Sequence, residues 1–337
     1  MSFEIRMVRA LTVAAFCATA LGLTGCTRGN DSDTVPSGAT SSPQAGEVVT
    51  VGFVGIGPEG PWRAANEASI QNSFTKEAGF DLKYAPSTNL DQDSQISAFT
   101  TFVDDGVDVI LLAPAEASGW SDALRLAQEA QIPVILIDGG IVPDDSSLYV
   151  TRIESDNTAI GATVADWAVT AFPAGAGYFI LEGPSGTDIV TQRDQGWESV
   201  MADHPEFKKI GAQSANWSAD EARSVIESVL TANNNLVPLI VAQNDEMGLG
   251  AMLAVEAAGL TPGVDVKIAT IGGNKGALQA LIDGRLSFVE EYNPIFGPTA
   301  VDVVNTVLKG GTVASSVIVP SKPFASITQE ELDAREY

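Results

Sequence analysis

Residues 107–137 read VDVILLAPAEASGWSDALRLAQEAQIPVILI and place two short apolar runs on either side of a longer segment with helical spacing. The runs Val107–Leu112 and Val134–Ile137 are continuous rather than alternating. Strands that are buried on both faces of a parallel sheet have this character. The stretch therefore predicts a strand–helix–strand unit with parallel strands.

The same alternation continues in both directions along the chain. Ala222, Val225, Ile226 and Val229 form a helical stripe that follows the capping pattern Ser218-x-x-Glu221. Further strands are expected at Val48–Val54, Phe80–Ala85, Leu148–Ile153, Gly177–Glu182, Lys208–Gln213, Val237–Ala242, Val266–Ile271 and Leu286–Glu291. The pattern predicts a doubly wound α/β fold, either as one sheet of ten strands or, closer to usual domain size, as two sheets.

The composition is that of a globular and strongly acidic chain. Hydrophobic residues make up 45% of the 337 residues, and 43 acidic against 18 basic residues give a net charge of −25. A phosphate backbone would repel such a chain, so nucleic acid is not an expected partner. Two cysteines and one histidine supply neither a disulfide scaffold nor a multi-histidine metal site, and no metal is expected.

Motifs that would indicate an enzyme are weak. Gly55-x-Gly57-x-x-Gly60 follows a predicted strand as a dinucleotide fingerprint does, but Pro58 and Pro61 remove N–H groups that should face a pyrophosphate. His204, the single histidine, has no partners with which to form a common catalytic triad. We therefore expect no enzymatic activity and no cofactor.

The first 47 residues predict export and anchoring. Arg6 and Arg9 precede the uncharged run Ala10–Leu23, which is short for a membrane span and has the length of a signal peptide core. Small residues before Cys26 resemble a bacterial lipoprotein signal, which implies removal of residues 1–25 and a lipid on Cys26; an ordinary signal peptide is the alternative. Residues 26–47 are rich in Ser, Thr, Gly and Pro and predict a flexible tether. The protein is thus expected outside the cytoplasm, anchored to the cell membrane.

Polar side chains cluster where the predicted strands end. Arg63 follows Trp62 at the start of a helix, and Asp138 and Asn244 each follow an apolar strand. Arg193 is expected on the helix after Glu182. Open parallel sheets bind ligands beyond the carboxyl ends of their strands. Bidentate polar groups beside an aromatic ring suit the hydroxyls and the apolar face of a sugar, although each residue alone could be an ion pair, a cap or packing.

Three stretches make the body resemble a known family: Gly60-Pro61-Trp62-Arg63-Ala64-Ala65, Ala113-Pro114-Ala115-Glu116-Ala117-Ser118-Gly119-Trp120, and Gln243-Asn244-Asp245-Glu246-Met247. The body resembles the type I solute-binding proteins of ABC importers, within the sugar-binding cluster that includes ribose- and galactofuranose-binding proteins. The resemblance implies the type I periplasmic binding protein fold, with two doubly wound parallel-sheet lobes joined by a three-crossover hinge. Residues 48–153 plus 273–291 are expected in the N-terminal lobe and residues 154–272 plus 292–337 in the C-terminal lobe, with crossovers near Ile153, Gly272 and Glu291.

The resemblance also implies a site and a function. Its ligand contacts map onto Glu59, Trp62, Arg63, Asp138, Arg193 and Asn244. The family usually has charged residues where this chain has Gly139 and Gly272, and Asn274 or Lys275 is a candidate to replace one of them. The implied function is capture of a monosaccharide or related polyol by a monomer that delivers it to an ABC permease. The alternative is a sensing protein that reports a ligand, such as an autoinducer-like furanose, to a membrane receptor.

Overall fold

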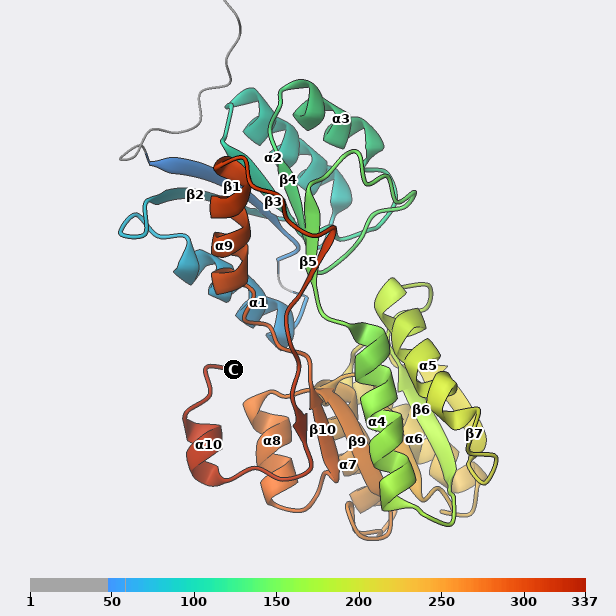
Figure 1. Ribbon diagram of the computed structural model, residues 1–337. Coiled ribbons are helices and arrows are strands. Elements are labelled where there is room, and N and C mark those ends of the chain that lie inside the picture. Colours follow the sequence, from blue (N-terminus) through green and yellow to red (C-terminus); the bar gives the residue numbers. More distant parts are fainter. Residues whose placement is uncertain (1–47, 58) are drawn as a thin grey trace, which may run out of the picture. The chain divides into compact units, whose positions relative to one another are not determined.

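The computed structural model describes residues 48–57 and 59–337, and the predicted signal peptide, Cys26 and tether lie outside these residues. The described chain contains two six-stranded sheets, each flanked by helices (Figure 1). This confirms the predicted α/β fold and favours two sheets over one. None of the helices in the described part combines the length and apolar character needed to cross a membrane.

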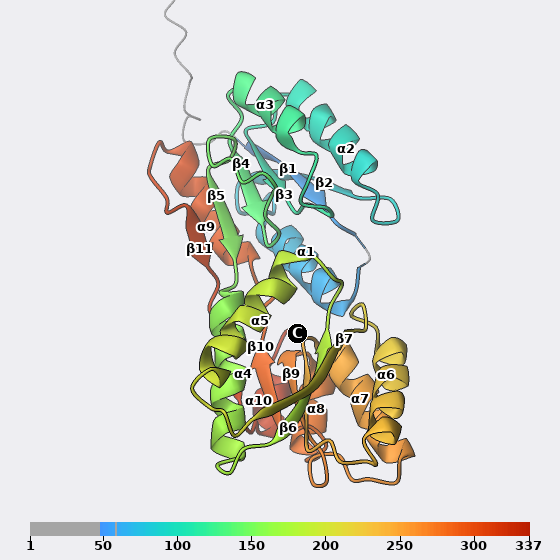
Figure 2. The same cartoon turned by 90° about the vertical axis from the view of Figure 1, so that its right-hand side faces the viewer.

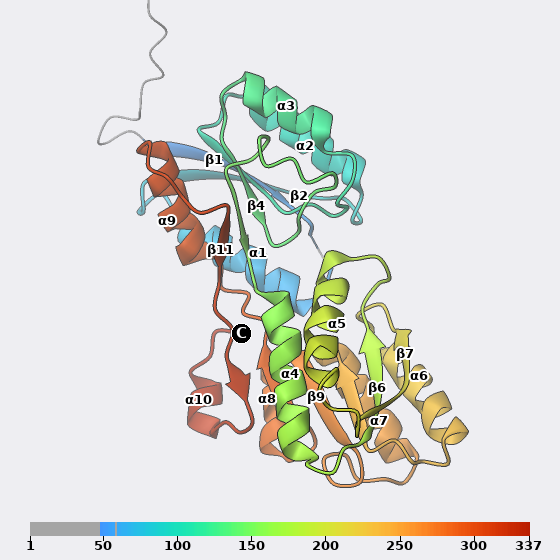
Figure 3. The same cartoon turned by 45° about the vertical axis from the view of Figure 1, so that its right-hand side comes forward.

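The sheet of the first lobe has only parallel neighbours. Its strand order is β11-β5-β4-β3-β1-β2. The strands are β1 (Val49–Gly55), β2 (Phe80–Pro86), β3 (Val109–Leu112), β4 (Val134–Ile137), β5 (Thr151–Glu154) and β11 (Ser316–Ile318). One face is covered by α1 (Pro61–Ser73) and α9 (Gly297–Leu308), and the other by α2 (Gln92–Asp104) and α3 (Ser121–Glu129) (Figure 3).

The sheet of the second lobe is parallel except at one edge. Its order is β12-β10-β9-β8-β6-β7, and only β12 is antiparallel to its neighbour. The strands are β6 (Gly177–Glu182), β7 (Lys208–Ser214), β8 (Leu239–Ala242), β9 (Lys267–Gly272), β10 (Phe288–Glu291) and β12 (Pro323–Phe324). One face carries α4 (Asn157–Ala171) and α5 (Asp188–Met201), and the other carries α6 (Ala219–Ala232), α7 (Asp245–Ala257) and α8 (Lys275–Ile282) (Figure 2), with α10 (Gln329–Asp333) beside α8.

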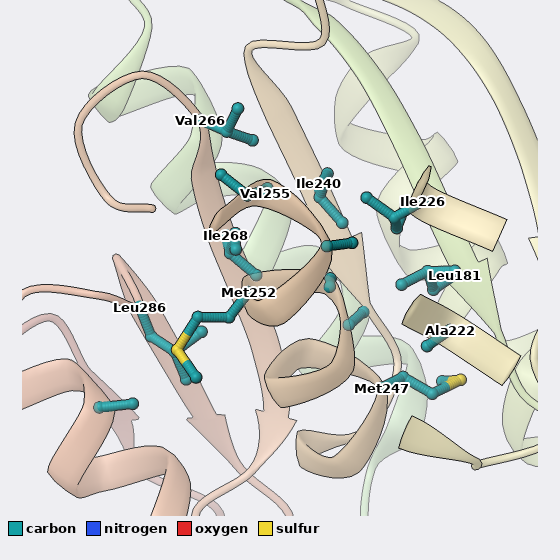
Figure 4. Close-up of a cluster of buried hydrophobic side chains, with 14 of the residues drawn as sticks. Leu181, Ala222, Ile226, Ile240, Met247, Met252, Val255, Val266, Ile268 and Leu286 are labelled. Atoms are coloured by element: carbon teal, nitrogen blue, oxygen red, sulfur yellow. The ribbon is translucent and has the colours of Figure 1, made fainter. Parts of the chain in front are cut away.

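Burial on both faces explains why the central strands β3, β4 and β8 are continuous apolar runs. In β8, Ile240 packs into the cluster under α6 and α7, whereas Val241 packs into the cluster under α4 and α5. Figure 4 shows the first of these clusters, where Ile226 from the predicted stripe lies near Ile240 and Leu181. Because side chains alternate between the two faces, every position of such a strand must be apolar.

The structure corrects the expected division between the lobes. Strand β10 pairs with β9, so residues 273–291 belong to the second lobe and Gly272 is no crossover. Helix α9 and strand β11 return to the first lobe, where Ala300 and Val303 join its core. The chain therefore crosses after β5, after β10 and after β11. The apolar face of α9 decides this exchange, because it is buried against α1 and the first sheet.

Candidate functional site

One cavity of about 180 Å³ collects side chains from the carboxyl ends of strands in both sheets. Its position agrees with the rule for open parallel sheets. The lining residues are Glu59, Gly60, Pro61, Trp62, Arg63, Asp138, Ile189, Arg193, Trp217, Asn244, Asp245, Glu246, Ile271, Gly272, Tyr292 and Tyr337. Aromatic rings, two arginines and several carboxylates therefore share one small space.

Arg63 lies in the first turn of α1, and three side chains hold its guanidinium in place. Its Nη2 donates to Asp138 Oδ2 at 2.7 Å, its Nε to Glu59 Oε2 at 3.2 Å, and its Nη1 to Asn66 Oδ1 at 3.2 Å. The side chain is buried, and burial alone would lower the pKa of the guanidinium. The carboxylates of Asp138 and Glu59 outweigh that effect and raise this pKa above its ordinary value. Arg63 is thus a fixed, permanent cation in the pocket wall.

Asp138 joins the end of β4 to the crossover after β10. Its backbone has a φ of +65°, in the left-handed region, so the chain turns sharply as the strand ends. Its backbone oxygen accepts a hydrogen bond from Arg152 Nε at 2.6 Å. Its carboxylate accepts from Arg63 and from the hydroxyl of Tyr292. Since a carboxylate offers about four acceptor positions, Asp138 can still accept from a ligand hydroxyl.

Two aromatic surfaces flank the arginines. Trp62 stacks on Tyr292 with ring centroids 4.3 Å apart, and the Arg193 guanidinium lies 4.6 Å from the Tyr292 centroid. Trp217 lies 5.8 Å from the same guanidinium. A Cβ on Gly183 would lie 2.1 Å from the Trp217 ring, so glycine at 183 provides the room for this tryptophan. The pocket is therefore suited to a molecule with an apolar face as well as polar edges.

Arg193 is buried on α5 and is only partly satisfied by the protein. Its Nε donates to Asn157 Oδ1 at 3.0 Å and its Nη1 to the backbone oxygen of Gln243 at 2.5 Å. Its Nη2 is buried and has no hydrogen-bond partner among the described residues. Burial lowers the pKa of this guanidinium. A buried donor without a partner is costly, which points to a ligand acceptor at this position.

The helix α4 sets the position of Arg193 through a close glycine contact. A Cβ on Gly161 would lie 2.1 Å from the backbone oxygen of Arg193, and a Cβ on Gly196 would lie 2.0 Å from the backbone oxygen of Thr158. Both distances are far below a normal carbon–oxygen contact. The two helices thus approach closely enough for Asn157 on α4 to hold Arg193 on α5.

The start of α7 supplies the acidic side of the pocket. Asn244 caps this helix, because its Oδ1 accepts from the Met247 N–H at 2.8 Å. Burial raises the pKa of Asp245 to about 6, even though Thr270 and the Asn274 N–H donate to it. Burial and the charge of Asp245 raise the pKa of Glu246 to about 7. This wall therefore offers acceptors whose charge changes near neutral pH.

Six of the seven residues predicted for the site line the cavity, and Asn274 does not. Asn274 instead caps α8 and donates to Glu246 Oε1 at 3.1 Å, and Lys275 is exposed. A Cβ on Gly272 would lie 2.3 Å from the Asp245 carboxylate. Asp245 therefore fills the space beside Gly272, the position at which the resemblance led us to expect a charged residue.

The sequence interpretation missed several lining residues, chiefly Tyr292, Trp217, Glu246 and Tyr337. Tyr292 directly follows β10, so the strand-end rule could have identified it. Trp217 has a φ of +61°, a backbone strain that the sequence does not reveal. Tyr337 reaches the cavity only through the path of the chain after α10, which local patterns do not predict.

Comparison with known proteins agrees with this geometry. Residues 51–312 match the family model described as a periplasmic binding protein domain. The fructose import binding protein FruE of Bifidobacterium longum (strain NCC 2705) is 44% identical over 330 residues, covering 96% of this chain and 97% of that protein. The galactofuranose-binding protein YtfQ of Escherichia coli (strain K12) is 32% identical over 305 residues, covering 89% and 95%.

A solved structure shares both fold and sequence. It is the periplasmic binding protein component of the arabinose ABC transporter from Shewanella sp. ANA-3, bound to alpha- and beta-L-arabinofuranose. It superimposes with a TM-score of 0.78 at 33% identity, covering 85% of this chain and 94% of that chain. Family match, relatives and fold agree, and the chain belongs to the periplasmic binding protein domain family.

Proposed function

We propose that this protein captures a monosaccharide in its furanose form outside the cytoplasm and delivers it to an ABC importer. The observation that carries the proposal is Arg193, a buried cation in the pocket wall whose Nη2 has no partner among the described residues. A sugar hydroxyl or ring oxygen would satisfy this donor. Arg63 and Asp138 would pair with further hydroxyls, and Trp62 and Trp217 would cover the ring's apolar face.

Ring size and chemical class rest on two supports. The cavity of about 180 Å³ is smaller than the roughly 300–1,000 Å³ of pockets for drug-sized ligands, which favours a single sugar ring. The relatives are named for import of fructose and for binding of galactofuranose, and a solved neighbour holds arabinofuranose. The charged pocket residues Arg63 and Asp138 engage each other rather than forming a nucleophile–base pair. Because the relatives are named as import and binding proteins, binding without turnover is the function we infer.

A thermal-shift screen of the purified protein tests this function. D-fructose, L-arabinose and D-galactose, which all populate furanose rings, are compared with mannitol, an open-chain polyol. A ligand at about 100 times its Kd should raise the free energy of unfolding by about 2.7 kcal/mol, a shift of several degrees in Tm. A shift with a furanose-forming sugar and none with mannitol is expected. If none of the three sugars shifts the Tm of protein that has been shown to carry no retained sugar, the proposal is contradicted.

The anchoring part of the proposal concerns Cys26 and has its own test. Expressed in a bacterium with lipoprotein processing, the full chain should partition into the detergent phase of a Triton X-114 extraction, because the acyl chains add membrane affinity. Cys26→Ser should move it to the aqueous phase. Cys17→Ser, within the predicted signal peptide, is the matched control and should change nothing. Equal partitioning of wild type and Cys26→Ser would exclude a lipid at Cys26.

A further inference from the structure

The chain after β12 is built into the second lobe and returns to the pocket. Helix α10 begins with a capping box, in which Thr328 and Glu331 bond each other's backbone N–H groups. Leu332 is buried in the core that α6, α7 and α8 share. Figure 1 shows the chain rising from α10 to Tyr337. The three residues Arg335–Tyr337 therefore start from a fixed helix.

Arg335 ties this segment to the crossover beside the pocket. Its Nη2 donates to Glu291 Oε1 at 2.6 Å and to the backbone oxygen of Gly273 at 3.2 Å. Its guanidinium also lies 5.1 Å from the ring centroid of Phe324. Both ends of the ion pair are largely buried, with 19% and 11% of the Arg335 and Glu291 side chains exposed. Glu291 directly precedes Tyr292, so the segment is attached where the site is formed.

Tyr337 lines the cavity on its acidic side. Burial raises the pKa of its phenol, and the charges of Asp245 and Glu246 raise it further. The phenol therefore stays protonated at physiological pH and remains a donor. Tyr337 belongs to the cavity wall, and no hydrogen bond joins its hydroxyl to another described residue. The hydroxyl is consequently available to a molecule in the cavity.

Asn244, by contrast, has little hydrogen-bonding capacity left. Its Oδ1 accepts from the Met247 N–H, and its amide donates to the Trp217 backbone oxygen at 3.2 Å and to Glu246 Oε2 at 3.0 Å. A side-chain amide has two N–H donors, and here both are used within the protein. A ligand on this side of the cavity therefore needs another donor.

We propose that Tyr337 is a specificity-determining residue of the ligand site and that Arg335 is its positioning residue. The Tyr337 hydroxyl donates to a hydroxyl oxygen of the bound molecule, and its ring limits the room beside Glu246. This inference rests on the proposed function, since it assigns the polyhydroxylated ligand one more contact. It also limits the size of the ligand, because the Tyr337 ring occupies part of the wall of a cavity of about 180 Å³ and leaves less room for a second sugar ring.

Isothermal titration of the purified full chain with D-fructose, L-arabinose and D-galactose tests the assignment. Tyr337→Phe removes one hydrogen bond and should raise the Kd of the bound sugar by about fivefold to tenfold. Tyr337→Ala should raise the Kd of this sugar at least as much. It should also bind a methyl glycoside or disaccharide of the same sugar more tightly than wild type does. Glu336→Ala, at an exposed neighbouring position, is the matched control and should leave Kd unchanged.

Arg335 is tested through its coupling to Tyr337. Arg335→Ala should raise Kd about as much as Tyr337→Ala, and Arg335→Lys should restore part of the affinity. The double variant should bind no more weakly than Tyr337→Ala alone, because both changes remove the same contact. If wild type binds a sugar and both Tyr337 variants match Glu336→Ala, the inference is overturned while the proposed function stands.

Discussion

Replacing Arg63 with alanine is expected to lower the free energy of unfolding by about 3–5 kcal/mol, because it leaves a buried carboxylate without its cation. Asp138 is 2% exposed and would keep only the Tyr292 hydroxyl as a side-chain partner. Sugar affinity should fall at least about tenfold as well, since a hydrogen bond from a charged donor contributes about 1.5–3 kcal/mol. Chemical denaturation and calorimetric titration measure the two effects separately.

A double variant distinguishes stability from binding. Arg63→Ala combined with Asp138→Asn removes both charges, so it should recover part of the lost stability while remaining defective in binding. Arg63→Lys keeps a charge without the fork that reaches Glu59, Asn66 and Asp138 together, and should be intermediate. If Arg63→Ala has wild-type stability and affinity, Arg63 and its partners neither stabilise the fold nor bind the ligand.

Replacing Gly161 with alanine is expected to weaken both the fold and the ligand site. The new Cβ would lie 2.1 Å from the backbone oxygen of Arg193, so α4 and α5 must move apart. Overpacking of this kind costs about 1–3 kcal/mol. The displacement also breaks the Asn157–Arg193 hydrogen bond, so affinity should fall by about tenfold or more. Melting temperature and Kd are the measurements.

The neighbouring alanine offers the control for this helix. Ala159→Ser changes a residue on the exposed side of α4 and should leave Tm and Kd close to those of wild type. Gly196→Ala places a Cβ on α5 that clashes with the backbone of α4, so it should lower Tm and affinity about as much as Gly161→Ala does. The double variant Gly161→Ala/Gly196→Ala should lose less stability than the sum of the two single losses, because one separation of the helices relieves both clashes. Unchanged affinity in Gly161→Ala would mean that α4 does not position Arg193.

Strands and helices were predictable where burial imposes a repeating pattern. The ten expected strands correspond to β1–β10. The central strands β3, β4 and β8 are fully buried apolar runs, whereas the edge strands β2 and β7 carry polar residues. The sequence did not indicate β11 and β12, which have three and two residues and lie at sheet edges. The exchange of β10 and α9 between the lobes was also beyond local patterns. The exchange depends on which of the two cores is covered by the face of α9 that carries Ala300 and Val303. Only the assembled molecule shows which core that is.

The site was predictable to the extent that chain position encodes it. Asp138 and Asn244 come just after strands, and Trp62 and Arg63 begin the helix that follows β1, so the topology brings all four together at the carboxyl edges of the sheets. Asn244 and Asn274 both follow a strand and both cap the next helix, yet only Asn244 also lines the cavity. Position alone cannot distinguish a side chain that serves a helix end from one that serves a ligand. That distinction depends on hydrogen-bond partners, which only the folded chain shows.

The return of α9 to the first lobe has a consequence for the order in which the chain can fold. Strands β1–β5 occupy a continuous stretch and can pair as soon as residue 154 has been synthesised. The apolar side that carries Ile70 and Phe74 must then wait for residues 297–308 before Ala300, Val303 and Val304 cover it. More than 140 residues separate the two halves of this core. A chain synthesised only as far as β5 leaves this apolar face uncovered, and exposed apolar surfaces of this kind favour aggregation.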